Sequence, residues 1–399
     1  MKPIQKFFVR ISNYALAGVE YLIRWPEPTV LTKYDDLINV LHKNNIKNLL
    51  LVSDKNVYKF GLTKYVEDAL KNGGINYTLY LDVTPNPTFE NVYTGKDLYT
   101  KNNCQALIAI GGGSVMDCAK TIGVLVNNKG NIEKFKGMFK FHHNIPLMIA
   151  FPTTSGTGSE TTVAAVVRND KTGEKFPIES MRLVPKYAFL DKNLLRDLPP
   201  SVFATTGMDA LTHSIEAYLN IDRTKKTKKY ALEASKLIKE NLVQGYKDKN
   251  DLKAKENMLH ASFLAGKAFT RSMVGNVHAI AHALGGKYNL PHGYLNAIIL
   301  PHILELYKNK ASKRLSELAI YIGIGKPSES EITNANTLIK WINDLNATFG
   351  LPTQIKEIKI EDIYDLARAS YKEAVPLYPC PVLFDEKDFV EIYKSLSVK

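Results

Sequence analysis

Four side chains in the second half of the chain have the types and spacing of a metal site. Asp209 and His213 stand four residues apart, and His278 and His292 follow in a later segment. Because positions i and i+4 share one face of a helix, Asp209 and His213 can reach the same ion. His292 lies between a proline and a glycine, which predicts a turn that directs its ring back toward His278. One carboxylate and three imidazoles suit iron(II) or zinc, and such an ion can do chemistry at an open coordination position.

Each of these histidines also has a purely structural interpretation. A histidine on an apolar helix face is more often a packed or hydrogen-bonded core residue than a ligand. Most of the chain's histidines, however, fall between residues 213 and 302, in surroundings rich in alanine and glycine. An unpaired imidazole is costly in such surroundings, so the clustering favours a shared role.

The composition is that of a globular protein with about two domains. The chain has 399 residues, of which 45% are hydrophobic and 23% charged, and its formal net charge is +12. The lysines are dispersed, and no arginine-rich arm occurs, so we expect a solvated basic surface and no nucleic-acid partner. No apolar run is long enough for a transmembrane helix, so we expect no membrane partner. The three cysteines show no CxxC spacing, which predicts free thiols and a cytoplasmic protein.

The alternation of segment types predicts an α/β domain followed by a helical one. Apolar runs at 48–54, 77–81, 106–110 and 146–151 read as strands, with helical stretches between them. Continuous apolar strands separated by helices predict a parallel, Rossmann-like sheet covered on both faces. After Pro199 and Pro200 the strand pattern fades and helical periodicity takes over. We therefore expect an α/β domain at 1–199 and an all-α domain, which contains the candidate metal ligands, at 200–399.

Two polar loops at strand ends predict a nucleotide site in the first domain. Gly111-Gly-Gly-Ser114 follows one strand and opens a helix, where the backbone can approach a pyrophosphate. The segment 153–160, Thr-Thr-Ser-Gly-Thr-Gly-Ser-Glu, follows another strand. Asp54 ends the 48–54 strand, where a carboxylate can accept ribose hydroxyls and would repel a 2′-phosphate, which favours NAD over NADP. A plain helix cap at Ser114 or Asp54 remains the alternative interpretation.

These segments together resemble the iron-containing (group III) alcohol dehydrogenases. The resemblance covers the chain from about residue 25 onward. It rests on GGGSVMDCAK (111–120), PTTSGTGSE (152–160), GMDALTHSIEAY (207–218) and VHAIAHALGGKYNLPHGYLNAIILPH (277–302). It implies a dehydroquinate synthase-like architecture, with an N-terminal dinucleotide-binding domain and a C-terminal helical domain.

The resemblance also implies roles for individual residues. It assigns the metal ligands to Asp209, His213, His278 and His292, and a further active-site histidine to His282. The implied cofactor contacts are Asp54, Asn86, Gly112, Gly113, Ser114, Asp117, Thr153, Thr154 and Thr157. Tyr294 and Asn276 depart from the family pattern, and we expect both to line the substrate pocket.

The expected function is interconversion of a primary alcohol and its aldehyde with NAD(H), with NADP(H) as the alternative coenzyme. The expected metal is iron(II), with zinc as the alternative, and the expected assembly is a homodimer. A polyol, hydroxyacid or lactaldehyde substrate stays open because pocket contacts that distinguish them are worth only a few kcal/mol, roughly 1–3 per methylene. A dehydroquinate synthase-like lyase and a non-enzymatic metal- or nucleotide-binding protein are further alternatives.

Overall fold

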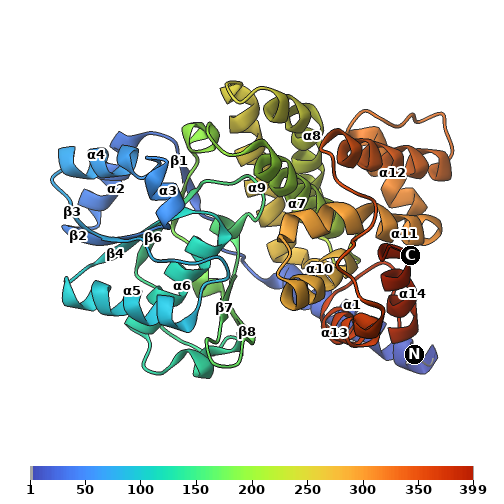
Figure 1. Cartoon of the computed structure of the whole chain (residues 1–399), viewed down its shortest axis with the longest axis horizontal. Helices are drawn as coiled ribbons and strands as arrows, with labels where there is room; N and C mark the ends of the chain where they lie inside the picture. The colour runs from blue at the N-terminus through green and yellow to red at the C-terminus, as the bar shows by residue number, and fades with distance from the viewer. Residues whose placement is uncertain (1–2, 399) are drawn as a thin grey trace. The chain divides into compact units, whose positions relative to one another are not determined.

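A computed structural model describes residues 3–398, which form two compact units. One unit is Trp25–Leu198, and the other joins the residues before Trp25 to those from Pro199 onward. The expected fold class is confirmed, because the first unit is an α/β unit and the second is helical (Figure 1).

The α/β unit is built on a six-stranded sheet whose strand pairs are all parallel. Its order is β1-β9-β6-β4-β2-β3. The strands are β1 (Thr29–Leu31), β2 (Asn48–Val52), β3 (Asn76–Tyr80), β4 (Ala106–Gly111), β6 (Leu147–Pro152) and β9 (Tyr187–Phe189). A smaller sheet has the order β5-β8-β7, formed by β5 (Gly137–Met138), β8 (Lys175–Glu179) and β7 (Ala164–Arg168).

Helices cover both faces of the large sheet, which explains its continuous apolar strands. Alternate strand residues enter opposite cores: Leu107 packs with α5 (Phe89–Lys101) and α6 (Gly113–Asn127), whereas Ile108 packs with α2 (Tyr34–Lys43) and α4 (Lys64–Asn72). The helices of this unit are α2 (Tyr34–Lys43), α3 (Lys55–Lys59), α4 (Lys64–Asn72), α5 (Phe89–Lys101) and α6 (Gly113–Asn127). Short 3₁₀ turns lie at η1 (Ile132–Phe135), η2 (Ser159–Thr161), η3 (Met181–Leu183) and η4 (Lys192–Leu195).

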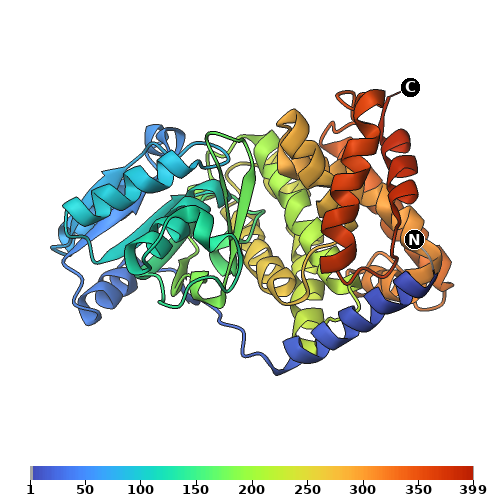
Figure 2. The same ribbon diagram turned by 90° about the horizontal axis from the view of Figure 1, so that it is seen from below.

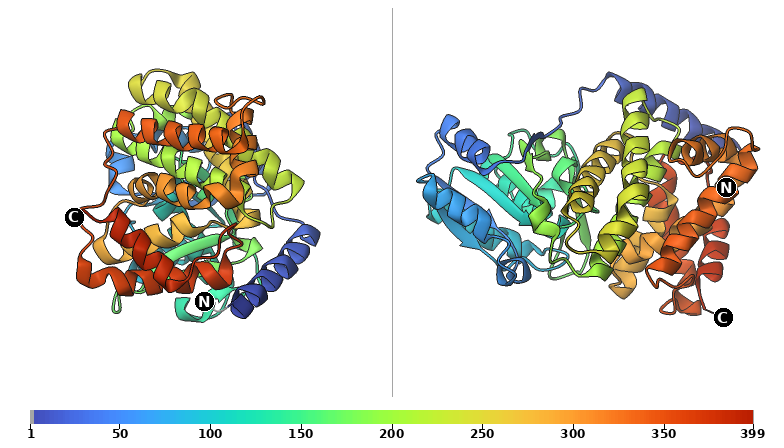
Figure 3. Two further views of the ribbon diagram at one scale, coloured as in Figure 1. Left: turned by 90° about the vertical axis from the view of Figure 1, so that its right-hand side faces the viewer. Right: turned by 90° about the horizontal axis from the view of Figure 1, so that it is seen from above.

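The second unit is a bundle in which α7 (Pro200–Leu219) contacts α8, α9 and α11. Pro200 opens α7 because a proline at the first helical position lacks an N–H that would be unpaired there anyway. The remaining helices are α8 (Lys225–Lys247), α9 (Leu252–Ser272), α10 (Asn276–Tyr288), α11 (His292–Tyr321), α12 (Glu331–Thr348), α13 (Ile363–Leu377) and α14 (Glu386–Leu396), with one 3₁₀ turn, η5 (Ile360–Asp362). Figure 3 shows these helices packed side by side.

The N-terminal helix α1 (Pro3–Leu22) groups with the helical unit, which differs from the expectation that residues 1–199 form one domain. Arg10 on α1 donates hydrogen bonds to the carbonyls of Cys380 (2.5 Å) and Pro381 (2.7 Å), and Asn13 is buried. Figure 2 shows α1 alongside this unit. Sequence periodicity could not reveal these contacts because they join segments 370 residues apart.

Among the described residues, no helix is both long enough and apolar enough to cross a membrane. The three cysteines are free and buried, as their spacing predicted.

Candidate functional site

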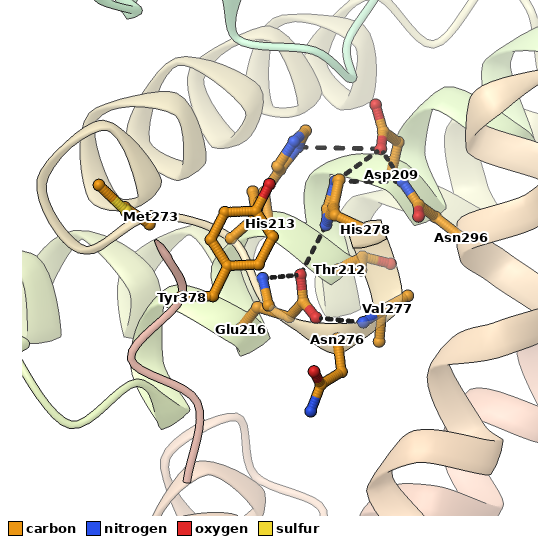
Figure 4. Close-up of polar contacts among 12 residues, drawn as sticks. Asp209, Thr212, His213, Glu216, Met273, Asn276, Val277, His278, Asn296 and Tyr378 are labelled. Carbon is orange, nitrogen blue, oxygen red and sulfur yellow. Dashed lines mark hydrogen bonds and ion pairs between the residues drawn. The ribbon is translucent and has the colours of Figure 1, made fainter. Parts of the chain in front are cut away.

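The four predicted metal ligands come together inside the helical unit, from three helices. Asp209 and His213 lie one turn apart on α7, His278 lies in the first turn of α10, and His292 is the first residue of α11. One ligand atom from each of the four lies within 4.8 Å of the others. Figure 4 shows Asp209, His213 and His278 directed toward one another.

The approach of α11 to α7 depends on a glycine beside His292. A Cβ built on Gly293 would lie 2.4 Å from the carbonyl oxygen of Thr205, which is impossible without moving a backbone. Glycine therefore lets the start of α11 pack directly on α7, and this contact brings His292 to Asp209. The predicted turn at His292 is wrong in position: the chain reverses just before it, where Asn289 adopts φ 53°, and His292 is already helical.

The cluster is compact and largely closed to solvent. Asp209 Oδ1 lies 3.9 Å from His213 Nδ1, 3.7 Å from His278 Nε2 and 3.5 Å from His292 Nε2. Asp209, His213 and His278 are buried, whereas the side chain of His292 is 38% exposed. The ring of His213 is stacked between those of Phe269 and His278, at centroid distances of 4.1 and 4.4 Å. Stacking on both faces fixes the orientation of this imidazole.

Charges within the cluster are strongly coupled. Burial opposes the charge on Asp209, but His213, His292 and His278 outweigh it and hold the pKa of this carboxyl far below its usual range. Burial also opposes charge on His278, yet Glu216 and Asp209 raise its pKa to about 9. Burial lowers the pKa of His292 well below its ordinary value. An ion that binds His278 therefore has to displace a proton.

Asn296 marks the point at which the ligand atoms converge. Its Nδ2 lies 2.7 Å from Asp209 Oδ1 and 3.1 Å from Nε2 of both His278 and His292. An amide NH₂ has two hydrogens, so it cannot satisfy three acceptors at once. A divalent metal ion can bind one carboxylate and three imidazoles at the same time, so the converging residues fit such an ion.

Glu216, which the sequence reading did not select, holds His278 from behind. Its Oε2 lies 2.6 Å from His278 Nδ1 and accepts the N–H of Gly275 (2.8 Å), while Oε1 accepts the N–H of Val277 (2.8 Å). The carboxylate thus fixes the start of α10 and leaves Nε2 of His278 facing Asp209 (Figure 4). A carboxylate in this position orients a metal-binding histidine and raises its basicity.

The Glu216→Gln variant is expected to bind divalent metal about 10- to 100-fold more weakly than the parent. The amide NH₂ would face either the N–H of Val277 or the N–H groups of Gly275 and His278, so at least one hydrogen bond must be lost. Metal titration of the metal-free proteins by calorimetry measures the change. Glu317→Gln is the matched control, because Glu317 accepts from Tyr218 and Lys228 and does not contact the cluster. Equal metal affinity in the Glu216 variant and the parent would show that Glu216 does not support metal binding.

His282 lies one turn after His278 and joins a second polar group. Its ring is stacked on that of His292 at 5.2 Å, and its Nδ1 lies 2.7 Å from Glu373 Oε1 on α13. The hydroxyl of Tyr378 donates to the same oxygen at 2.6 Å. Burial opposes the charge on Glu373, but His282 and Tyr378 outweigh it and lower the pKa of this carboxyl.

In the α/β unit, the two predicted polar loops lie next to each other. Strands β4 and β6 are paired in parallel up to Gly111 and Pro152. The segments 112–114 and 153–157 therefore follow the carboxyl ends of two adjacent strands. A Cβ on Gly113 would lie 3.2 Å from the side chain of Thr157, and one on Gly112 would lie 3.6 Å from Thr154. Thr153 itself is buried. The strand order reverses between β2 and β4. Open α/β sheets bind ligands at the carboxyl ends of the strands beside such a switch point.

The remaining predicted cofactor residues have structural partners. Asp54 caps α3, with Oδ1 accepting the N–H groups of Asn56 and Val57 at 2.9 and 3.0 Å. The N–H of Asn86 donates to the hydroxyl of Ser114 at 3.3 Å.

Asp117 and Lys120, both on α6, hold the second polar loop in place. Asp117 accepts the hydroxyl of Ser159 and the N–H of Val166, both at 3.0 Å. The fully buried Lys120 donates to the carbonyls of Ser159 (2.7 Å) and Thr162 (3.0 Å). These bonds hold the chain just beyond Thr157 and hence the shape of the loop.

Glu160, in the same anchor, is expected to make stability depend on pH. It is 1% exposed, burial raises its pKa to about 7, and among the described residues its Oε1 has no hydrogen-bond partner. The pKa of this carboxyl is higher in the folded protein than in the unfolded chain, so its protonated form stabilises the fold below pH 4.5. This stabilisation is lost as the pH rises through 7, and the total loss is about 3 kcal/mol. The Glu160→Gln variant has no carboxyl group to ionise at this position. Between pH 4.5 and 7 its free energy of unfolding should therefore rise relative to that of the parent.

Urea unfolding of the parent and the Glu160→Gln variant at about pH 5 and pH 8 measures this difference. Glu174→Gln serves as the control, because the side chain of Glu174 is 51% exposed. A difference between variant and parent that stays constant with pH would contradict the prediction.

The two residues that depart from the family pattern do not lie in the cluster. Asn276 is buried and donates to the hydroxyl of Tyr307 at 2.6 Å, and its place in a substrate pocket stays a prediction. Tyr294 lines a surface pocket together with Pro352, Thr353 and Gln354.

Comparison with known proteins establishes the family. Residues 31–192 match the family described as iron-containing alcohol dehydrogenase, and residues 203–397 match its C-terminal part. Alcohol dehydrogenase 4 from Saccharomyces cerevisiae is 36% identical over 365 residues, which cover 90% of this chain and 94% of that protein. The chain therefore belongs to the iron-containing alcohol dehydrogenase family, whose members are oxidoreductases.

Solved structures agree with this assignment. The alcohol dehydrogenase from Oenococcus oeni is 32% identical, with a TM-score of 0.89 over 93% of this chain and 99% of that one. The sulfoacetaldehyde reductase from Bifidobacterium kashiwanohense, determined in complex with NAD+, is 28% identical, with a TM-score of 0.83 over 93% of this chain and 98% of that one.

Proposed function

We propose that the protein interconverts a primary alcohol and its aldehyde by hydride transfer with NAD(H), using a divalent metal bound by Asp209, His213, His278 and His292. The convergence of these four side chains within 4.8 Å carries the proposal. The helical unit would be the metal-binding, catalytic domain, and the α/β unit the dinucleotide-binding domain.

The proposed ion is iron(II), with zinc as the alternative, since this ligand set suits both. When bound, it would supply Lewis-acid stabilisation of an alkoxide or polarisation of an aldehyde carbonyl. The burial of Asp209, His213 and His278 keeps water away from these ligands and strengthens their electrostatic effect. His282 would exchange the alcohol proton at Nε2, because its Nδ1 is engaged by Glu373.

The proposed coenzyme is NAD, with NADP as the alternative. NAD supplies the hydride chemistry, and the protein supplies its binding and orientation. Gly112, Gly113 and Ser114 at the start of α6 offer N–H groups and a favourable helix dipole for a pyrophosphate. Asp54 Oδ1 caps α3, and the carboxylate would still oppose a 2′-phosphate. The remaining proposed contacts are Asn86, Asp117, Thr153, Thr154 and Thr157. The sulfoacetaldehyde reductase with bound NAD+ supports this choice.

The test is anaerobic oxidation of NADH by protein reconstituted with iron(II) or zinc, with NADPH in parallel. Butanal, lactaldehyde, glyceraldehyde and a hydroxyacid precursor serve as substrates. We expect turnover of the simple aldehyde with NADH and one of the two metals. Preference for lactaldehyde or glyceraldehyde would transfer the proposal to a diol or polyol substrate, and preference for the hydroxyacid precursor would transfer it to a hydroxyacid. No turnover of any aldehyde by protein that has bound metal would refute it.

The location and assembly complete the proposal. Three free, buried cysteines support a reducing compartment, and we propose the cytoplasm. We also propose a homodimer, which light scattering of the purified protein tests directly.

A further inference from the structure

A carboxylate on α13 stands behind the proposed proton carrier in the helical unit. Glu373 Oε1 lies 2.7 Å from Nδ1 of His282, on α10. The two residues are 91 positions apart in the sequence, so packing of α13 against α10 creates the contact. The side chain of His282 is 41% exposed and that of Glu373 is 29% exposed, so this pair borders solvent, unlike the buried pair of His278 and Glu216.

A second donor orients the carboxylate. The hydroxyl of Tyr378, the residue that follows α13, donates to the same Oε1 at 2.6 Å. An ionised carboxylate accepts hydrogen bonds only, so the ring nitrogen that faces Glu373 has to carry the hydrogen. In a neutral imidazole the other nitrogen, Nε2, is then an acceptor.

We propose that Glu373, oriented by Tyr378, is a positioning residue for His282, which it holds in the tautomer that carries its hydrogen on Nδ1. The inference rests on the proposed function and extends it to residues outside the metal cluster. In alcohol oxidation the O–H proton passes to Nε2 of His282, Nδ1–H stays bonded to Glu373, and the proton on Nε2 then leaves to solvent. Glu373 remains ionised throughout, as the carboxylate does in other histidine–carboxylate pairs.

The alternative is that Glu373 only stabilises the packing of α13. A structural role would leave the tautomer of His282 unchanged and would change KM, kcat and stability together. The Glu373→Gln variant separates the two roles, because a glutamine can accept from Nδ1–H with its oxygen or donate to Nδ1 with its NH₂. The volume is kept, but the tautomer is no longer fixed.

The first readout does not involve activity. Two-dimensional ¹H–¹⁵N NMR of histidine-labelled, zinc-loaded protein reports which ring nitrogen carries the hydrogen, and the His282→Asn variant assigns the signal. We expect the Nδ1–H tautomer alone in the parent and a mixture of the two tautomers in Glu373→Gln. The same tautomer in both proteins, or an Nε2–H tautomer in the parent, would overturn the proposal. This readout holds even if no alcohol is turned over, so failure of the proposed function is distinguishable.

The second readout is kinetic. Glu373→Gln is expected to lower kcat by about 10²-fold, within the range of general acid–base catalysis, while KM for the alcohol and metal content stay near the parent values. Tyr378→Phe should cause a smaller loss, and Glu386→Gln, on an exposed part of α14, should cause none. Added to His282→Ala, Glu373→Gln should lower kcat little further, because both changes interrupt one unit. Additive losses would show that Glu373 does not act through His282.

Discussion

Replacing His278 by alanine is expected to remove the metal ion and to lower kcat/KM by about 10³-fold or more, which corresponds to about 4 kcal/mol of lost transition-state stabilisation. His278 contributes more than its ligand atom. Its Nδ1 binds Glu216, and its ring packs against that of His213 at a centroid distance of 4.4 Å. The substitution therefore removes one ligand, leaves Glu216 without its histidine partner, and frees one face of His213.

Metal analysis after gel filtration, together with steady-state kinetics, measures the effect. His260→Ala is the matched control, since His260 lies on α9 of the same unit and stacks on Phe263, outside the cluster. The control should keep the metal content and kcat/KM of the parent. A His278 variant that retained one tightly bound ion would show that the cluster is not the metal site.

Replacing His282 by alanine is expected to lower kcat by about 10²- to 10⁴-fold while the metal content stays unchanged. His282 faces His292 and Glu373, but its nitrogens are not among the four ligand atoms that converge. Loss of its ring removes the proton carrier and leaves the ligands in place. The measurements are again kcat and the number of metal ions bound per chain.

His302→Ala provides the comparison for this variant. His302 lies on α11 like His292, but its Nε2 contacts the carbonyl of Thr353 at 2.9 Å, away from the cluster. It should keep normal turnover. Loss of the ion in His282→Ala would contradict the separation of ligand and proton carrier, and unchanged kcat would remove His282 from the proton path.

Much of the fold could be predicted because it depends on local patterns. The apolar runs at 48–54 and 106–110 became β2 and β4, since a strand buried on both faces requires continuous apolar residues. The i, i+4 spacing of Asp209 and His213 correctly placed both on one face of a helix. The place of α1 was not predictable, because it depends on hydrogen bonds from Arg10 to a segment at the other end of the chain.

The residues that support the metal ligands and His282 also differ in whether the sequence could have identified them. Glu216 stands three residues after His213 on the same helix, so the spacing could have identified it. Asn296 likewise stands four residues after His292. Glu373 and Tyr378 carried no such signal, because only the packing of α13 brings them to His282. Spacing within one helix is visible in a sequence, whereas contacts between distant helices are not.

Titration of metal-free protein with iron(II) under anaerobic conditions, with NADH-dependent aldehyde reduction followed at each addition, tests the central claim most directly. We predict that activity rises in proportion to bound metal, reaches its plateau at about one ion per chain as expected for a single four-ligand site, and disappears when a chelator removes the ion. If iron(II) fails to support turnover, the same titration with zinc decides between the two metals. Full activity in protein that contains neither ion would contradict the account.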